Sequence, residues 1–458
     1  MNERQTVFLA KSEVKAHDLE HKRKLAFNIH KYNDSVVKGK QQFADLELAR
    51  QRAKNIKWKT IEHLDSYLEQ FEKNFTSRGG KLIWAETGEE ALQAVLQICR
   101  EKNTRQVVKA KSMVTEEIHL NDFLADNGIE SVETDLGEYI QQLDGEAPYH
   151  IVTPAMHKSK EDVARVFFEK LGTEPNLTPS EITKIARKNL REKYITAEVG
   201  ITGGNFLLAD IGGVCVSENE GNGRLSTTFP PVQIAIVGIE KLLPSVNDLQ
   251  LFWPLLATYG TGQNVTVYNT IFTGPRKAGE TDGPLEMYVI LLDNGRTNLL
   301  RKEVRESMYC IRCGSCLNAC PVYKNIGGHA YGATYSGPIG SVITPHMLGM
   351  EEYKHLSYAS SLCGNCTEVC PVKINIHEML LENRTIAAGD NLNGFKENMT
   401  WRLWRDAMMS RSILNAAGAG MKSKIVNKIF KDSWGKHRGA IQFADRSFNK
   451  MWKERAKR

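Results

Sequence analysis

The stretch "MYCIRCGSCLNACPVYKN", residues 308–325, carries four cysteines within eleven residues and follows the last of them with a proline. A shorter version, "SSLCGNCTEVCPVKIN", occupies residues 360–375 and carries three more cysteines. Aligned backward from the proline, the second stretch has Ser360 where the first has Cys310. Seven of the nine cysteines therefore stand in two versions of one motif, and the second version lacks its first thiol.

The first motif has the spacing Cys310-x2-Cys313-x2-Cys316-x3-Cys320 followed by proline, which is the spacing of bacterial two-cluster ferredoxins. Three thiolates two residues apart hold three corners of one iron–sulfur cube, and the fourth cysteine reaches a neighbouring cube. A structural zinc site closes at four ligands, which fits seven cysteines poorly. Disulfides are disfavoured because the N-terminal residues lack the pattern of a secretion signal. The motifs predict two iron–sulfur clusters.

In two-cluster ferredoxins the fourth cysteine of each motif binds the cluster held by the other motif, and this pattern assigns the ligands here. The predicted ligands are Cys310, Cys313, Cys316 and Cys370 for the first cluster, and Cys320, Cys363 and Cys366 for the second. One corner of the second cluster lacks a thiolate, and three outcomes remain open there. It is a 3Fe-4S centre, or a 4Fe-4S centre completed by Ser360 or solvent, or one completed by a partner protein. His355 is a further candidate donor.

The chain divides into four expected regions. Residues 1–80 are charge-rich with helical spacing and predict a helical N-terminal cap. Residues 81–300 alternate strand-like and helical segments, which predicts an α/β domain with a mainly parallel sheet and an antiparallel part. Residues 301–390 hold both cysteine motifs and predict an α-helical dicluster ferredoxin-like domain. Residues 391–458 predict a basic helical tail.

Composition and charge indicate the class of protein. Of 458 residues, 41% are hydrophobic and 25% are charged, which is typical of a globular protein with more than one domain. Apolar runs such as "VQIAIVGI" (232–239) are too short for a transmembrane segment, so we expect a cytoplasmic protein. The net charge is +6, yet residues 422–458 alone carry twelve Lys and Arg against three acids.

This basic tail has three interpretations. It is a solvated helix, or it docks to an acidic subunit, or it makes a peripheral contact with an anionic membrane surface. Nucleic-acid binding is not expected, because no recognition motif accompanies the charge. Cys99 and Cys215 lie in apolar runs and are expected to be buried core thiols.

Two glycine-dense stretches mark the α/β region, at residues 200–224 and 273–296. Neither matches G-x-G-x-x-G in its strand–helix context, and neither contains a P-loop, so nucleotide binding is not predicted. Tight turns explain both stretches. Alternatively, Arg224 and Arg276 grip a small carboxylate in bidentate fashion.

Several stretches together carry a family resemblance. In chain order they are "GGNFLLADIGGVCVSENEGNGRLSTTFP", "GPRKAGETDGP", "CIRCGSCLNACPVY", "GGHAYG", "GPIGSVITP" and "YASSLCGNCTEVCPV". Over about residues 60–375 the chain resembles the lactate utilisation protein B family, the iron–sulfur subunits of a bacterial three-component L-lactate oxidation system.

The resemblance implies a LUD-type domain with a fold like those of sugar-phosphate isomerases and CoA transferases. It also implies two 4Fe-4S clusters on the seven cysteines, and electron transfer while L-lactate becomes pyruvate, together with lactate utilisation proteins A and C. The chain shows no flavin or nicotinamide fingerprint. One alternative is a CoA-transferase-like enzyme, in which Glu218 of "SENEGNG" would be the nucleophile. Another is a redox adaptor for a different 2-hydroxy acid.

Overall fold

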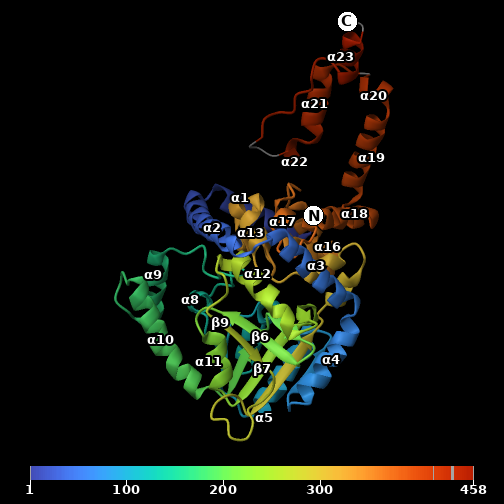
Figure 1. The fold of residues 1–458 in the computed structure, drawn as a ribbon. Coiled ribbons are helices and arrows are strands. Elements are labelled where there is room, and N and C mark those ends of the chain that lie inside the picture. The colour runs from blue at the N-terminus through green and yellow to red at the C-terminus, as the bar shows by residue number, and fades with distance from the viewer. Residues whose placement is uncertain (1, 416, 435–437, 457–458) are drawn as a thin grey trace. The chain divides into compact units, whose positions relative to one another are not determined.

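The computed structural model describes residues 2–415, 417–434 and 438–456. The chain forms two compact units, residues 1–385 and 386–458, and each is described by itself (Figure 1). The first unit contains both sheets and both cysteine motifs.

A six-stranded parallel sheet forms the centre of the first unit, in the order β1-β10-β7-β4-β2-β3. The strands are β1 (Lys81–Ala85), β2 (Gln106–Lys109), β3 (Glu130–Glu133), β4 (Val199–Thr202), β7 (Val232–Gly238) and β10 (Glu286–Leu292). Every residue of β7 is buried, as expected for a strand with neighbours on both edges and cover on both faces. This confirms the predicted α/β domain with a mostly parallel sheet.

The period-two alternation of β7 separates two cores. Ile234 and Ile236 pack in the core that includes α5 (Gly88–Glu101). Ala235 and Val237 pack in the larger core that contains most of the cysteines. Successive side chains of a strand point to opposite faces, so one apolar strand serves both cores.

A second sheet has the order β8-β5-β6-β9. Its strands are β5 (Phe206–Leu208), β6 (Gly213–Glu218), β8 (Leu242–Leu243) and β9 (Tyr268–Phe272). β6 pairs antiparallel with both β5 and β9, whereas β5 and β8 are parallel. The closely spaced later strands thus supply the antiparallel part expected from the sequence.

Helices surround the two sheets. Figure 1 shows α4 (Leu64–Thr76) and α10 (Pro179–Thr196) on opposite sides of the strands. The helices of this region are α6 (Met113–Glu117), α7 (Leu120–Asp126), α8 (Leu136–Asp144), α9 (Lys160–Leu171), α10 (Pro179–Thr196), α11 (Asn222–Thr228) and α12 (Leu249–Thr261).

The N-terminal region is helical. It consists of α1 (Glu3–His17), α2 (Leu19–Gly39), α3 (Leu46–Glu62) and α4 (Leu64–Thr76). Along α4, Leu64, Leu68, Phe71 and Phe75 are all buried, so the stripe seen in the sequence is the packed face. α4 contacts β1 and β8, while α1 contacts α14 (Pro321–Ile326) and α16 (Met350–Tyr358). These helices therefore pack on the cysteine region as well as on the α/β domain.

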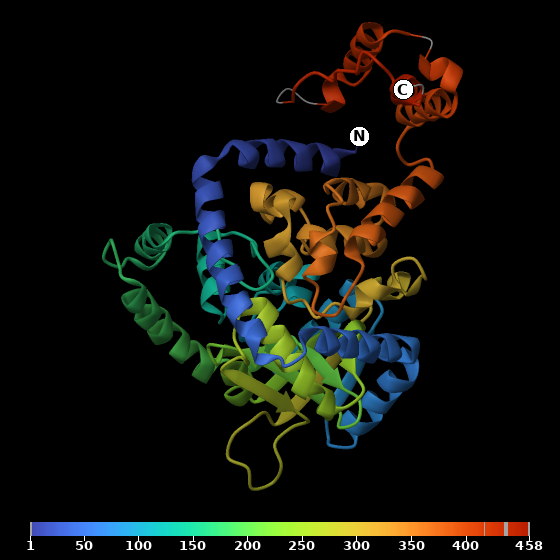
Figure 2. The ribbon, with the colours of Figure 1, turned by 45° about the horizontal axis from the view of Figure 1, so that its top comes forward.

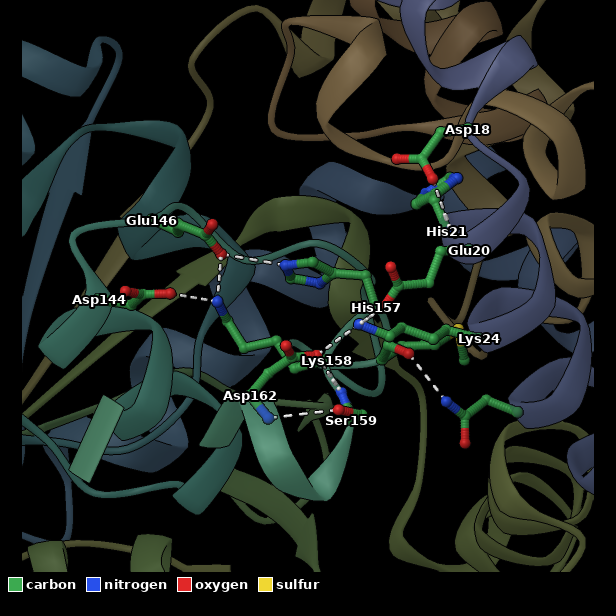
Figure 3. Close-up of polar contacts among 12 residues, drawn as sticks. Asp18, Glu20, His21, Lys24, Asp144, Glu146, His157, Lys158, Ser159 and Asp162 are labelled. Atoms are coloured by element: carbon green, nitrogen blue, oxygen red, sulfur yellow. Dashed lines mark hydrogen bonds and ion pairs between the residues drawn. The ribbon is translucent and has the colours of Figure 1, made fainter. Parts of the chain in front are cut away.

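Polar contacts fix the segment between α8 and α9 (Figure 3). Lys24 Nζ on α2 lies 2.6 Å from Asp162 in the first turn of α9, and within the segment His157 Nε2 lies 3.0 Å from Glu146. The same segment contains His150, which packs against the first cysteine loop: a Cβ added at Gly314 would lie 3.1 Å from the His150 ring. The ion pairs thereby support one wall of the cysteine region.

Helices also form the region that holds the two cysteine motifs. They are the 3-10 helix η5 (Arg305–Tyr309), α13 (Ser315–Ala319), α14, α15 (Gly337–Leu348), α16, α17 (Asn365–Glu368) and α18 (Ile376–Gly389). Figures 1 and 2 show the segment from α13 to α17 at one end of the strands. The glycine-rich connector packs tightly, because a Cβ at Gly328 would lie 1.9 Å from the backbone oxygen of Tyr149.

The second unit is helical, with α19 (Phe395–Met409), α20 (Arg411–Asn415), α21 (Ala419–Ile429), α22 (Lys431–Trp434) and α23 (Phe448–Arg455). Among its described side chains after Gly394, only that of Val426 is buried. The rings of Trp401 and Trp404 contact that of Phe430, at centroid distances of 6.3 and 6.0 Å. Within the described ranges, no helix has the length and apolar character needed to span a membrane.

Candidate iron–sulfur site

The first cysteine motif is a loop that runs from η5 into two short helices. Cys310 directly follows η5, Cys316 lies in α13, and Cys320 is the N-cap residue of α14. Gly314 precedes α13 with φ of 78°, a left-handed conformation that glycine adopts without strain. Pro321 takes the first position of α14, where no backbone N–H is required.

The second motif repeats this backbone. Gly364 precedes α17 with φ of 79°, as Gly314 precedes α13. Arg312 and Leu362, at equivalent positions in the two loops, also have positive φ, at 59° and 53°. Positive φ is uncommon for residues other than glycine, so its occurrence at both positions identifies one shared loop conformation. The sequence repeat is therefore also a structural repeat.

Ser360 occupies the place of the missing thiol. The N–H of Arg312 donates to Cys310 Sγ at 3.4 Å, and the N–H of Leu362 donates to Ser360 Oγ at 3.1 Å. Both contacts join a side chain to the backbone two residues later. The Ser360 hydroxyl thus stands in its loop where the Cys310 thiol stands in the other.

Four cysteines line one small cavity. Cys310, Cys313 and Cys316 come from the first loop, and Cys370 comes from the second. Ile374 N–H donates to Cys370 Sγ at 3.4 Å. The remaining lining is mainly aliphatic: Ile151, Ile311, Ile339, Pro371, Val372, Ile374 and Ile376. Soft sulfur donors in apolar surroundings, with N–H groups directed at sulfur, fit an iron–sulfur cluster.

The other three cysteines are neighbours at α13 and α17, which pack together. Burial and the nearby Cys320 thiol raise the pKa of Cys366 to about 11. Cys363 is exposed, and its pKa is lowered by the Asn365 N–H. Across the part of the chain that the structure describes, no group of three or more His, Cys, Asp or Glu side chains converges on a single metal ion. Cysteines that share a cluster bind separate iron atoms.

Buried charges connect the first cysteine loop to the end of β7. Glu240 accepts from Arg296 Nε at 2.6 Å and from Arg312 Nη2 at 3.3 Å. Arg296 also makes a bidentate pair with Glu117, at 2.9 and 2.8 Å. Lys57 Nζ donates to the backbone oxygen of Glu240 at 2.6 Å. Burial acts to raise the pKa of Glu240, but the two guanidinium groups outweigh it and hold that pKa well below its usual value.

Three residues of the α/β domain were candidates from the sequence: Glu218, Arg224 and Arg276. The Glu218 carboxylate accepts the backbone N–H groups of Gly223 and Arg224, at 2.6 and 2.8 Å. Burial raises the pKa of Glu218. The Arg224 and Arg276 side chains are exposed, and neither lines the cavity that Glu218 lines. The structure gives no support to a carboxylate grip made by those two arginines.

Other residues singled out in the sequence are buried. Cys99 and Cys215 lie in the cores, as expected, and burial raises the pKa of Cys99 to about 11. His355 lies on α16 with its ring centroid 5.4 Å from that of Phe8.

Two basic residues beside the first loop were missed. Arg312 stands inside the motif, between Cys310 and Cys313, and Lys241 follows β7 directly. A charged pair at the end of a fully apolar strand, "IVGIEK", is the sequence signal that points to Glu240 and Lys241.

The comparisons with known proteins agree with this architecture. Residues 68–292 match the LUD domain family, and residues 306–374 match a 4Fe-4S dicluster domain. The Lactate utilization protein B of Bacillus velezensis is 47% identical over 345 residues, which cover 75% of this chain and 72% of that protein. That of Bacillus cytotoxicus is 46% identical over 350 residues, 76% of this chain and 74% of that protein.

One solved structure, a DUF162 family protein from Deinococcus radiodurans, covers 50% of this chain and 98% of its own, with 14% identity and a TM-score of 0.27. That likeness is too weak to carry an argument about the fold. The two relatives share nearly half of their aligned residues with this chain over most of their own lengths. The chain therefore belongs to the lactate utilization protein B family.

Proposed function

We propose that this chain is a cytoplasmic electron-transfer protein that takes part in the oxidation of L-lactate to pyruvate. Its partners in that proposal are lactate utilisation proteins A and C, which with it make a three-component complex. The observation that carries the electron-transfer role is the cavity lined by four cysteines drawn from both motifs. The link to lactate comes from the name of the relatives.

The proposed ligands follow the cross-ligation pattern. The first 4Fe-4S cluster takes Cys310, Cys313, Cys316 and Cys370, and the second takes Cys320, Cys363 and Cys366. Ser360 Oγ is the proposed occupant of the fourth corner of the second cluster. The matching N–H contacts of Ser360 and Cys310 support this assignment. When bound, such clusters accept and release single electrons.

The chain's own residues tune the first cluster. Arg312, largely buried, brings a positive charge into its loop, and Arg296 lies behind it, against the carboxylates of Glu117 and Glu240. Positive charge and N–H groups near the sulfurs raise the reduction potential, because they favour the more negative, reduced state. The mainly aliphatic lining of the cysteine cavity limits the access of water to these thiolates.

EPR spectroscopy with iron and sulfide analysis on anaerobically purified chain tests the cofactors. About eight irons per chain support two complete cubes, and about seven indicate a trinuclear second centre. Cys310→Ala should remove the first cluster's signal, while Cys99→Ala, in a buried core away from the motifs, should leave both. Zinc, with little or no iron, would contradict the proposal.

Growth experiments test the substrate. A deletion strain should lose growth on L-lactate as sole carbon source and regain it with the wild-type gene. Loss of growth on glycolate or D-lactate instead would assign the chain to another 2-hydroxy acid. Glu218→Gln should retain complementation, because the Glu218 carboxylate serves its own turn by accepting the N–H groups of Gly223 and Arg224, and glutamine keeps one of these two acceptors. CoA-thioester turnover that this variant abolishes would favour the CoA-transferase alternative.

A further inference from the structure

A cavity of about 400 Å³ lies where the six-stranded sheet meets the first cysteine loop. Its sheet side is made by residues that follow three neighbouring parallel strands: Ala110 and Lys111 after β2, Gly203 and Asn205 after β4, and Lys241 after β7. Its opposite side includes Arg312 and Cys313. The cavity therefore touches both the LUD domain and a proposed cluster ligand.

The strand order reverses at this edge of the sheet. β2 lies between β3 and β4. The chain passes from β2 to its neighbour β3 and then crosses to β4 on the other edge of β2. In open α/β sheets, ligands bind at the carboxyl ends of the strands where the strand order reverses. The volume also falls within the range of small-molecule sites.

The acidic groups of the cavity wall already have partners. Asp135, Glu218 and Glu220 all line it, and each accepts backbone N–H groups. The donors are Gly137 and Glu138 for Asp135, Gly223 and Arg224 for Glu218, and Leu136 for Glu220. Asp135 and Glu218 are thus held by backbone groups close to them in sequence, and Glu220 is held by the start of α8.

Two basic side chains of the cavity wall have fewer hydrogen-bond partners than the acidic ones. Lys241 is only 7% exposed, and among the described residues its ammonium group makes no hydrogen bond or ion pair. Arg312 Nη2 reaches Glu240, but its buried Nη1 has no hydrogen-bond partner in the described structure. Lys111, in contrast, donates to the Val152 backbone oxygen. A buried cation without a partner is costly, so the Lys241 ammonium group calls for an anion, and the unpartnered Nη1 of Arg312 offers that anion a second donor.

We propose that this cavity binds a short 2-hydroxy- or 2-oxocarboxylate, with the carboxylate held between Lys241 Nζ and the Arg312 guanidinium. The choice among carboxylates rests on the proposed function. Asn205 lines the same cavity, and its side-chain nitrogen makes no hydrogen bond within the described ranges, which leaves a donor for the second oxygen of the ligand. Cys313 on the wall places the ligand beside the first cluster's loop.

A different explanation for the two cations is that they only balance the negative charge of the first cluster's thiolates. The two explanations differ in their consequences. A charge-balancing lysine affects the cluster, whereas a ligand-binding lysine affects the affinity for a carboxylate.

The test uses the full chain, purified anaerobically with its clusters, and calorimetric titration with L-lactate and with pyruvate. We expect saturable binding, which Lys241→Met should weaken by roughly tenfold or more, because it removes a charge-assisted contact. Lys241→Arg should restore most of the affinity. Lys277→Met, which removes an equal charge from an exposed loop outside the cavity, should bind like the wild type.

Iron content and the EPR signal of the first cluster are measured on every variant. Loss of binding in Lys241→Met with both clusters intact supports the site. Absence of saturable binding to the wild type, or wild-type affinity in Lys241→Met, overturns it, and so does loss of the first cluster with binding unchanged. Reduction of the clusters by lactate in the presence of the partner proteins is measured separately. If lactate reduces the clusters but does not bind to this chain, the site is refuted and the proposed function stands. If lactate binds but does not reduce the clusters, the site stands and the proposed function is refuted.

Discussion

Glu240 joins the end of β7 to the first cysteine loop, and Glu240→Gln tests how strongly that junction stabilises the fold. The carboxylate lies 2.6 Å from Arg296 Nε and 3.3 Å from Arg312 Nη2, and the Glu240 side chain is 3% exposed. Glutamine keeps the volume but removes the negative charge between the buried guanidinium group of Arg296 and the largely buried one of Arg312. Removing one partner of a buried ion pair costs about 3–5 kcal/mol. We expect the free energy of unfolding of the first unit to fall by that amount.

Thermal unfolding of the cluster-loaded chain measures the effect. The entropy of unfolding is about 2.1 cal/mol/K per residue, which gives about 0.8 kcal/mol/K for a unit of 385 residues. The midpoint should therefore fall by about 4–6 °C at neutral pH. Glu62→Gln is the matched control, because Glu62 pairs with Arg305 at 2.7 Å but is 33% exposed. Its midpoint should change by about 1 °C or less.

The pH dependence provides a second check. The guanidinium groups overcome the effect of burial and hold the pKa of Glu240 below its usual value. A lowered carboxyl pKa stabilises the fold above the unfolded-state pKa, and this contribution is lost as the pH falls through the folded-state value. The difference between wild type and Glu240→Gln should thus be full at neutral pH and shrink below about pH 4.3. A neutral-pH shift no larger than that of Glu62→Gln, or a difference that grows on acidification, would refute the reasoning.

Three further perturbations follow from the structure. Ser360→Cys should add a thiolate to the second cluster and lower its reduction potential in an EPR-monitored redox titration; an unchanged potential and iron content would contradict the proposed corner. Glu138, whose two buried carboxyl oxygens lack partners in the described structure, has a pKa raised well above its usual value by burial and then by Glu133. Because the unfolded state ionises at lower pH, Glu138→Gln should gain stability over the wild type as the pH rises above about 4.3, measured by urea midpoints. Gly200→Ala should abolish soluble protein, because its Cβ would lie 1.8 Å from the Ser226 backbone oxygen, whereas Gly389→Ala, with open space, should express normally.

The cysteine repeat was predictable because ligand spacing is a local property. Three thiols at two-residue intervals need a particular loop, and the sequence contains that loop twice. The alignment of Ser360 with Cys310 needed only the common proline, and the two N–H contacts agree with it. The apolar strand at residues 232–238 and the buried stripe of α4 were predictable for the same reason, since periodicity reports which face is covered.

The charged junction could not be predicted in the same way. Lys57, Glu240 and Arg296 come from α3, the end of β7 and the segment after β10, and only the tertiary fold brings them together. In sequence, a single buried charge looks like any exposed one. Arg224 and Arg276 were selected for their glycine-rich surroundings, yet glycine there serves the turns and both arginines face solvent. Burial of a charge depends on long-range packing, which local patterns do not report.

The proposed cavity and the first cluster share Arg312 and Cys313, so their equilibria cannot be independent. A carboxylate bound beside Cys313 adds negative charge next to the site where an electron would arrive, which disfavours the reduced state. Because coupling between two equilibria is reciprocal, reduction must weaken carboxylate binding by the same factor. In the proposed oxidation, the acid would therefore bind more tightly while the cluster is oxidised and would be released once the electron has arrived. If the proposal holds, Lys241 and Arg312 set the strength of that coupling, since both line the cavity and Arg312 lies between Cys310 and Cys313.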